Sequence, residues 1–205
     1  MTRPLPRSFY RRPAPTVAPE LLGRVLVRTL PDGERLVARI VECEAYQEDD
    51  PASHSYKGLT PRTEVMFGPP GHLYVYLSYG AHWCMNVVTG RDGEGSAVLL
   101  RAAQPLEGID RMRMHRGFHD ERLLCAGPGR LTQALAISRD QNGTDLVSGE
   151  ELAIVRGLPM PEANVRVATR IGLTVAREQP WRFIEANSPF VSRGRTGGLP
   201  WVREG

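Results

Sequence analysis

The sequence is almost free of lysine, because Lys57 is the single lysine among 26 lysine and arginine residues. Arginine therefore carries nearly all of the positive charge, and its planar guanidinium binds phosphate oxygens in a two-pronged geometry that lysine does not offer. A GC-rich genome would produce the same bias. The scarcity of lysine also leaves few amine groups for any reaction that forms a Schiff base.

Cysteine is scarce as well, and long apolar runs are missing. Cys43, Cys84 and Cys125 are odd in number, widely spaced and without a CxxC pair, which argues against a disulfide framework and a zinc ribbon. No stretch approaches the roughly 18 consecutive apolar residues of a membrane span, and the N-terminus lacks the apolar segment of a secretory signal. We therefore expect reduced, mostly buried thiols in a cytoplasmic protein with no membrane partner.

Motifs for metals and nucleotide cofactors are also absent. His115 and His119 have the i, i+4 spacing of metal ligands on a helix, but Gly117 lies between them and no acid or cysteine completes the set. His82 and Cys84 would share a strand face, again without partners. Neither the P-loop spacing nor a G-x-G-x-x-G turn after a strand occurs. The sequence predicts no metal site and no organic cofactor.

The remaining composition fits a globular protein with a mild preference for an anionic partner. The chain has 205 residues, 41% hydrophobic and 24% charged, with a net charge of +3 and a pI near 9.0, which suits one domain or a domain with extensions. Residues 1–15 hold four arginines, four prolines and no acid. We expect this segment to be an extended basic arm, which would either follow a phosphate backbone or remain a solvated tail, and residues 16–205 to form the functional domain.

The hydrophobic pattern predicts strands interspersed with short helices. A helix capped by Thr16 is expected to end at Gly23. A first hairpin is expected over residues 24–45, with its turn at Pro31-Asp32-Gly33, and a second hairpin over residues 73–88. The full set adds strands at 24–30, 35–45, 98–100, 152–155, 165–168 and 181–184, and helices at 105–116 and 128–137. The fold class is therefore α+β, a single domain with a curved antiparallel β-sheet core and surrounding helices.

Tyrosines gather on the second hairpin. Alternation places Tyr74 and Tyr76 on one face of the strand, and Tyr79 precedes Gly80 at the turn. Flat rings in such positions can stack on nucleobases or fill the gap left by an extruded nucleotide. A tyrosine-rich strand that packs against an ordinary neighbour gives the same pattern. Tyr79 is harder to explain structurally, since a bulky ring at an exposed tip gains little from folding.

Two carboxylates, Glu42 and Glu44, lie two residues apart on the strand of the first hairpin. They project from the same strand face, and a carboxylate that faces a pocket can hold and deprotonate a water. An exposed strand face with two acids is the structural alternative. His54 lies in the polar loop 47–72, which is too long for a simple connection. It would either donate a hydrogen bond to a ligand or be an ordinary loop histidine.

Together these segments resemble the alkyladenine (3-methyladenine) DNA glycosylase family. The resemblance covers nearly the whole chain from about Pro6 onwards, and so many collinear blocks make it far more specific than any one motif. The blocks are Val41-Glu42-Cys43-Glu44-Ala45-Tyr46, Ala52-Ser53-His54-Ser55, Thr60-Pro61-Arg62-Thr63, Pro70-Gly71-His72-Leu73-Tyr74-Val75-Tyr76, Tyr79-Gly80, Cys84-Met85-Asn86, Leu99-Leu100-Arg101-Ala102, Leu106-Glu107-Gly108, Gly127-Pro128, Leu131-Thr132-Gln133-Ala134-Leu135 and Asn187-Ser188-Pro189.

The resemblance implies roles for individual residues of this sequence. Glu44 matches the general base that positions the attacking water, and Arg101 matches the arginine that helps to hold that water. Tyr46 and His54 match residues packed on one side of the flipped base, and Tyr76 matches the ring on the other side. A cage of this kind attracts purines that are cationic after alkylation at N3 or N7, by stacking and cation–π contact.

Two further matches concern selectivity and DNA contact. Asn86 matches a pocket residue that crowds the exocyclic amino group of normal guanine, and Tyr79 matches the residue inserted through the minor groove into the vacated stack. The resemblance therefore implies that the second hairpin protrudes and inserts into DNA. A shorter match places Ile171 near the pocket.

The family implies base removal from duplex DNA that contains damaged purines, carried out by a monomer that would be nucleoid-associated in a bacterium. Lys57 matches no family role, so we expect no strand cleavage, since that reaction needs an amine nucleophile. One rival function is a non-catalytic module that binds damaged DNA, against which Glu44 and Arg101 argue. A nucleoside hydrolase is a second rival, but the basic arm, Tyr79 at a tip and the arginine bias favour a polymer as substrate.

Overall fold

The long strand β2 (Arg35–Tyr46) runs through the centre of the sheet and organises the fold. In the computed structural model, which describes residues 3–192, the first half of β2 pairs with β1 (Val25–Thr29) and its second half with β8 (Arg182–Glu185) along the same edge. The other edge of β2 pairs with β5 (Ala97–Glu107), with bulges near Glu42. Strands from both ends of the chain therefore meet on β2.

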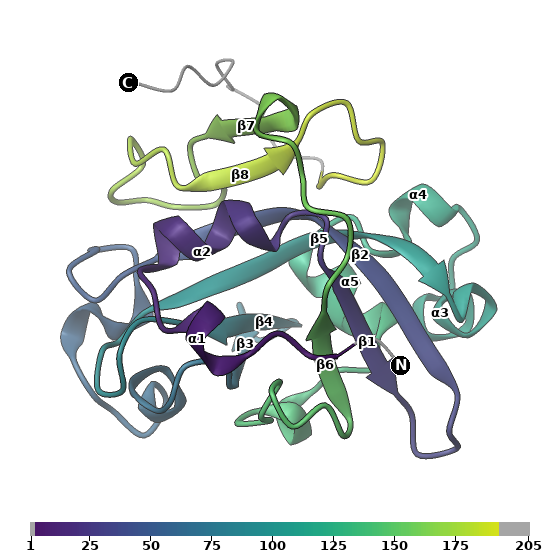
Figure 1. Ribbon diagram of the computed structural model, residues 1–205, viewed down its shortest axis with the longest axis horizontal. Helices are drawn as coiled ribbons and strands as arrows, with labels where there is room; N and C mark the ends of the chain where they lie inside the picture. The colour runs from purple at the N-terminus through teal and green to yellow at the C-terminus, as the bar shows by residue number, and fades with distance from the viewer. Residues whose placement is uncertain (1–2, 193–205) are drawn as a thin grey trace.

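The other strands extend this centre into an open eight-stranded sheet in which every pairing is antiparallel. A hairpin of β3 and β4 lies beyond β5, β6 lies beyond β1, and β7 pairs with β8 (Figure 1). The bounds of these strands are β3 Leu73–Ser78, β4 His82–Val88, β6 Leu152–Val155 and β7 Val165–Ala168. The strands predicted from the sequence are all present, and β5 extends seven residues beyond its predicted end at Leu100.

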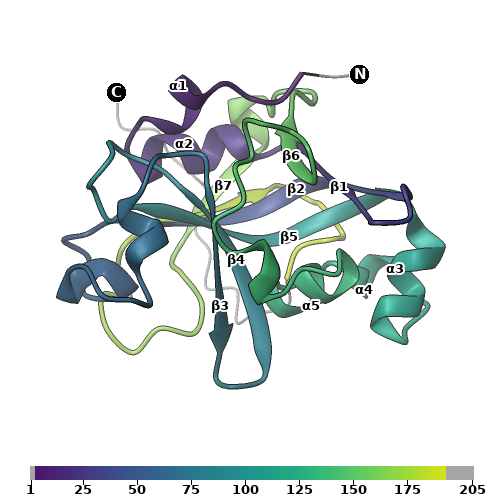
Figure 2. The ribbon, with the colours of Figure 1, turned by 90° about the horizontal axis from the view of Figure 1, so that it is seen from below.

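Short helices cover both sides of the sheet. Helices α1 and α2 lie on one side of the central strands and α3, α4 and α5 on the other (Figure 2). Their bounds are α1 Arg7–Tyr10, α2 Ala14–Leu21, α3 Ile109–Arg116, α4 Glu121–Leu124 and α5 Pro128–Ala134, and single 3₁₀ turns occur at His54–Lys57, Glu64–Phe67, Arg139–Gln141 and Glu162–Asn164. None of the helices in residues 3–192 combines the length and the apolar character that crossing a membrane requires.

Three helix boundaries differ from the predictions, and one of them is the end of α5, which stops at Ala134 instead of near residue 137. Helix α2 begins at Ala14 instead of after Thr16, with Pro15 in its first turn, where the missing N–H of proline removes no helical hydrogen bond. Helix α3 begins at Ile109 instead of Pro105, because the strand β5 continues past Pro105 and stays paired with β2 as far as Glu107, after one register shift. A proline near a strand end was therefore misread as the first turn of a helix.

The N-terminal segment is not the extended arm that its proline and arginine content predicted. Leu5, Tyr10 and Ala14 are buried in the main core, and residues 7–10 form a helical turn. The Arg7 guanidinium donates to the Asp145 carboxylate at 2.6 Å. Residues 3–15 therefore pack on the domain, because three apolar anchors outweigh the breaking tendency of the prolines. Residues 193–205 of the predicted domain lie outside the described residues.

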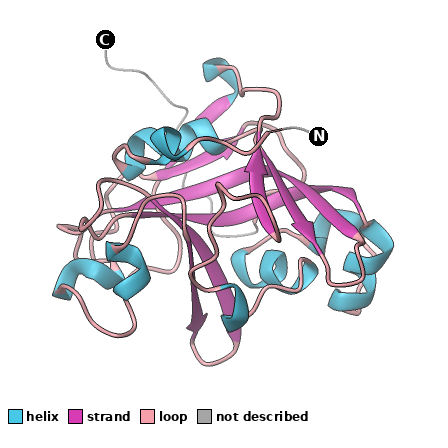
Figure 3. Ribbon diagram, turned by 60° about the horizontal axis from the view of Figure 1, so that its bottom comes forward, coloured by secondary structure: helices cyan, strands magenta, loops and turns pink. Residues whose placement is uncertain are grey.

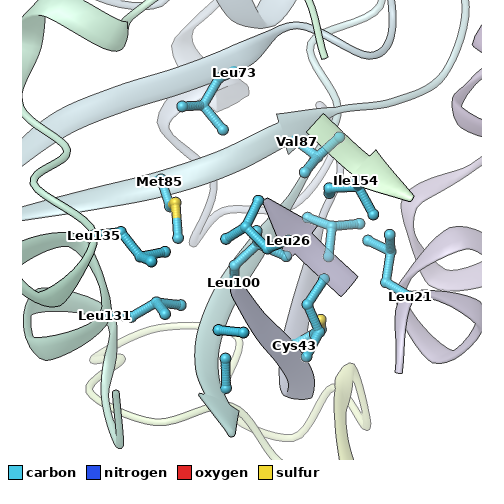
Figure 4. Close-up of a cluster of buried hydrophobic side chains, with 14 of the residues drawn as sticks. Leu21, Leu26, Cys43, Leu73, Met85, Val87, Leu100, Leu131, Leu135 and Ile154 are labelled. Carbon is cyan, nitrogen blue, oxygen red and sulfur yellow. The ribbon is translucent and has the colours of Figure 1, made fainter. Parts of the chain in front are cut away.

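The main core joins the helices to the sheet. Figure 4 shows side chains from strands β1 to β6 interlocking with leucines of α2 and α5, among them Leu21, Leu26, Leu100, Leu131 and Ile154. All three cysteines are buried as free thiols. The predicted class, a single α+β domain on antiparallel strands, is confirmed (Figure 3).

Candidate active site

A cavity of about 500 Å³ opens between the β3–β4 hairpin, the loop around His54 and the loop after β7. Six of the seven residues singled out from the sequence line it, which means that segments distant along the chain converge as the motifs implied. These six are Tyr46, His54, Tyr76, Tyr79, Asn86 and Arg101. The seventh, Glu44, lies directly behind the wall and is fully buried.

Glu44 is held by three donors from three different segments. Its Oε2 accepts hydrogen bonds from the Tyr46 hydroxyl at 2.9 Å and from Arg101 Nη1 at 3.1 Å. Its Oε1 accepts from the backbone N–H of Ile171 at 2.8 Å. A carboxylate has about four lone-pair positions, so three are occupied and one remains. The three donors all line the cavity, so they place the carboxylate at its boundary.

Glu42 shares the strand face with Glu44, as predicted, but has a different role. Its carboxylate accepts from Arg182 Nε at 2.7 Å, from Arg101 Nε at 3.2 Å, and from both the N–H and the hydroxyl of Ser192 at 2.6 and 2.8 Å. These four donors occupy its roughly four lone-pair positions, so Glu42 has no position left for a water. It orients Arg101 instead.

Arg101 is the link between the two carboxylates. Burial alone would lower the pKa of its guanidinium, but Glu44 and then Glu42 reverse that effect and raise the pKa. The buried cluster of Glu42, Glu44, Arg101 and Arg182 contains two negative and two positive groups, so its formal charges cancel. This balance allows a carboxylate to stay buried next to a cavity without an uncompensated charge.

Aromatic rings form one wall of the cavity. The His54 and Tyr76 ring centroids are 4.4 Å apart at 74°, and the Tyr74 and Tyr76 rings are 5.6 Å apart at 28°. His54 Nδ1 lies 3.1 Å from the Tyr74 hydroxyl, within hydrogen-bonding distance. Tyr46, at the end of β2, is half-buried and lines the same cavity. The space therefore has aromatic boundaries suited to a flat ring.

The charge state of these rings is set mainly by burial. Burial, reinforced by Arg62, lowers the pKa of His54 to about 4, so the imidazole is neutral at pH 7. Burial raises the pKa of both Tyr46 and Tyr76, which keeps both phenols protonated. The aromatic wall is therefore uncharged, and it does not repel a cationic ring placed against it.

Asn86 is fixed in place by the hairpin itself. It lies directly opposite Tyr74 in the β3–β4 register, and its Nδ2 donates to the Tyr74 carbonyl at 3.2 Å. The side chain is 5% exposed and borders the cavity. Its position is thus determined by strand pairing, so a ring that enters the cavity meets a polar group that cannot readily move away.

Tyr79 lies at the tip of the hairpin, which projects from the body of the molecule (Figure 2). The turn is closed by the N–H of Ala81, which donates to the Ser78 carbonyl at 3.1 Å. Tyr79 has a φ of 50° and Gly80 a φ of 67°, and the Tyr79 side chain is 91% exposed. A bulky residue in the left-handed region is rare and costs free energy. Nothing in the described fold repays that cost.

Three residues in or next to the cavity were not assigned a role from the sequence: Arg62 and Tyr74, which line it, and Arg170, which does not. Arg62, within the Thr60–Thr63 block, has its guanidinium carbon 5.7 Å from the Tyr76 ring centroid. Tyr74 was recognised as an aromatic strand residue but not as the partner of His54. Arg170 is buried behind Tyr46, at 4.6 Å from its ring centroid. Because Arg62 lies in one of the blocks that carry the resemblance, its position at the cavity could have been predicted. No local sequence pattern predicts the position of Arg170.

Possible metal ligands do not converge in the described part of the chain. Among residues 3–192, no three histidine, cysteine, aspartate or glutamate side chains gather as a metal-binding group. His115 instead lies within hydrogen-bonding distance, 2.9 Å, of the Ala134 carbonyl. Helix α3 ends at Arg116, so His119 lies beyond it and the two histidines do not share a helix face.

Comparisons with known proteins all identify the same family. The sequence profile of the family described as Methylpurine-DNA glycosylase (MPG) matches residues 8–189. A protein from Carboxydothermus hydrogenoformans is 50% identical over 189 residues, covering 92% of this chain and 98% of its own. One from Methanoculleus marisnigri is 49% identical over 192 residues, covering 92% and 98%. Both carry the name "Putative 3-methyladenine DNA glycosylase".

Proposed function

The chain belongs to the methylpurine-DNA glycosylase family, and from this membership and the geometry of its cavity we propose that it is a monofunctional DNA glycosylase of base excision repair. Its substrate is duplex DNA that contains alkylated or otherwise damaged purines of the 3-methyladenine type. The observation that carries the proposal is the position of Glu44, a buried carboxylate held by three cavity-lining donors directly behind a space bounded by aromatic rings.

The cavity suits a purine that has been flipped out of the stack. Tyr46, His54 and Tyr76 all border it, and the volume of about 500 Å³ exceeds that of one base. A purine alkylated at N3 or N7 is positively charged and is attracted to electron-rich ring faces. The neutral state of His54 removes a repulsive charge from that wall. Asn86 stands where it would crowd an exocyclic amino group.

Glu44 and Arg101 supply the hydrolytic chemistry. The proposal places the attacking water at the one lone-pair position of Glu44 that remains, where Arg101 helps to orient it. The water oxygen bonds to C1′ of the sugar as the bond from C1′ to the base nitrogen breaks. The electron pair leaves with the base, and the water proton passes to Glu44. An alkylated cationic purine leaves as a neutral base, so its departure requires no added proton.

Tyr79 acts in the step before chemistry. An extruded nucleotide leaves a gap in the duplex, and a side chain inserted there prevents its return. Tyr79 is the exposed ring at the tip of the projecting hairpin, and the adjoining face of that hairpin borders the cavity. One hairpin thus supplies both the ring that enters the DNA base stack and part of the cavity that binds the flipped base.

Strand cleavage is not part of the proposed activity. It requires an amine that forms a Schiff base with the abasic sugar, and Lys57 is exposed and is not one of the residues that line the cavity. Borohydride should therefore trap no covalent complex with DNA from which the base has been released. A trapped adduct that disappears in Lys57→Arg would show that the enzyme is bifunctional.

The central test compares wild type with Glu44→Gln on methylated duplex DNA, read as alkali-sensitive abasic sites. We expect base release by wild type, and a loss of at least about 100-fold in Glu44→Gln with retained affinity for DNA. The matched control is Glu20→Gln, an exposed glutamate paired with Arg12, which should release base at the wild-type rate. Tight binding by wild type without base release would instead identify a damaged-DNA-binding module.

A further inference from the structure

One buried side chain outside the family-matched set connects the segments that surround Glu44. Arg170 follows β7, and the side chains of Arg170 and Asp50 form an ion pair that is almost completely buried. Arg170 Nη2 donates to Asp50 Oδ1 at 3.0 Å, Nη1 donates to the Ala45 carbonyl at 3.0 Å, and Nη2 donates to the Ala176 carbonyl at 3.2 Å. One guanidinium therefore joins the end of β2, the loop that leads to His54, and the loop between β7 and β8.

Figure 2 shows these two loops side by side, the first in blue and the second in yellow-green. The guanidinium carbon of Arg170 lies 4.6 Å from the Tyr46 ring centroid and 5.3 Å from the Trp181 ring. It thus packs against the same tyrosine whose hydroxyl donates to Glu44. The next residue along the chain, Ile171, donates its backbone N–H to the other oxygen of Glu44.

Stability alone is a poor explanation for this arrangement. Burying two charges costs as much as their attraction returns in many proteins, so a buried ion pair is weak evidence for stability. Arg170 Nε adds to the cost, since it is buried without a hydrogen-bond partner among the described residues. What the pair does provide is a fixed spatial relation between two of the three donors to Glu44.

We propose that Arg170 and Asp50 form a positioning pair for base excision, which orients Glu44 through Tyr46 and Ile171. This inference rests on the proposed function. Arg170 touches neither substrate nor DNA, since its side chain has no exposed surface. The role requires arginine, because the planar fork binds a carboxylate and two carbonyls at once while its face packs on rings, and lysine offers a single point charge.

The test measures single-turnover base release and DNA affinity in Arg170→Lys and Asp50→Asn. A misplacement of about 1 Å at reacting groups costs up to roughly 100-fold in rate, so we expect a decrease of about 10- to 100-fold in both variants. The dissociation constant for a duplex with a stable abasic-site analogue should change by less than about twofold. Hydrogen exchange in a peptide that contains Ile171 should be faster in Arg170→Lys than in wild type.

The matched control is Arg28→Lys, because Arg28 is another buried arginine in an ion pair, with Glu151, on a strand far from the cavity. It should lose stability and keep the wild-type rate. If Arg170→Lys does not fold, Asp50→Asn decides, since it preserves shape. If folded Arg170→Lys and Asp50→Asn release base at the wild-type rate, or lose no more rate than Arg28→Lys does, the positioning role is wrong while the proposed function stands. Absence of base release by wild type would overturn the proposed function and the positioning role with it.

Discussion

Replacing Tyr79 with glycine should make the protein more stable and less active at the same time. The φ of 50° at Tyr79 costs an L-amino acid about 1–2 kcal/mol, and glycine adopts it without that cost. Because the side chain is 91% exposed, its removal forfeits almost no packing. The substitution therefore removes backbone strain without creating a cavity.

The net gain is smaller than the strain, because glycine also increases the conformational entropy of the unfolded chain by about 0.5–1 kcal/mol. From the midpoints of the two ranges, a net stabilisation of about 0.75 kcal/mol remains. In a domain of this size, 1 kcal/mol moves Tm by about 2–4 °C, so we expect Tm to rise by about 1–4 °C. Thermal unfolding followed by circular dichroism measures the shift.

Activity should change in the opposite direction. A ring stacked on a base contributes about 1–3 kcal/mol, which corresponds to about 5- to 150-fold in an equilibrium. Single-turnover base release from duplex DNA should fall by that factor in Tyr79→Gly, and Tyr79→Phe, which keeps the ring, should stay close to wild type.

Ala136 provides the matched control. It has a φ of 51°, is exposed, and does not line the cavity, so Ala136→Gly should raise Tm without affecting base release. A lower Tm in Tyr79→Gly would refute the strain argument. A higher Tm with wild-type base release would refute the role of the hairpin tip in holding the flipped state.

Three further predictions concern the buried groups. The pKa of His54 is about 4 in the folded protein against 6.5 in the unfolded chain, so the stabilisation present above pH 6.5 should be lost as pH falls towards 4. Urea midpoints of wild type should accordingly decline more steeply over this range than those of His54→Gln, and parallel curves would contradict this. Glu42→Gln should destabilise the protein by about 3–5 kcal/mol, because it leaves a buried guanidinium uncompensated, whereas Glu20→Gln should cost less than about 1 kcal/mol in the same urea titration. Asn86→Ala should increase the release of unmodified guanine from duplex DNA, measured by chromatography, and an unchanged ratio of methylated to normal purine would exclude Asn86 from selectivity.

The strands could be predicted because their signals are local, whereas Tyr46, Asn86 and Arg101 were identified only through the resemblance to a known family. Alternation fixed the faces of Tyr74 and Tyr76, and the two-residue spacing of Glu42 and Glu44 correctly placed both on one face of β2. Roles could not be read from that spacing alone. By spacing alone Glu42 and Glu44 look equivalent, and only the resemblance singles out Glu44. The physical difference comes from Ser192 and Arg182, which donate to Glu42 and not to Glu44.

The features that were missed depend on contacts distant in sequence. Arg170 and Asp50 are separated by 120 residues, and neither lies in a pattern that predicts a partner. The N-terminal segment was misjudged for a related reason, since proline and arginine dominate its composition while burial is decided by Leu5, Tyr10 and Ala14. The composition of a segment hides a few apolar residues among many polar ones, whereas the burial of the segment depends on those few residues.

The order of these contacts along the chain has a consequence during protein synthesis. Glu42 and Glu44 emerge from the ribosome early, but Ile171, Arg182 and Ser192, which supply donors to them, come from the last part of the described chain. Because these donors lie 127 residues or more along the chain from the acids they contact, the two acids stay without these partners until the chain has been extended through Ser192. A truncated or stalled chain would therefore carry the hairpin and the aromatic rings without a properly held carboxylate. Such a chain could touch the genome but could not remove bases from it.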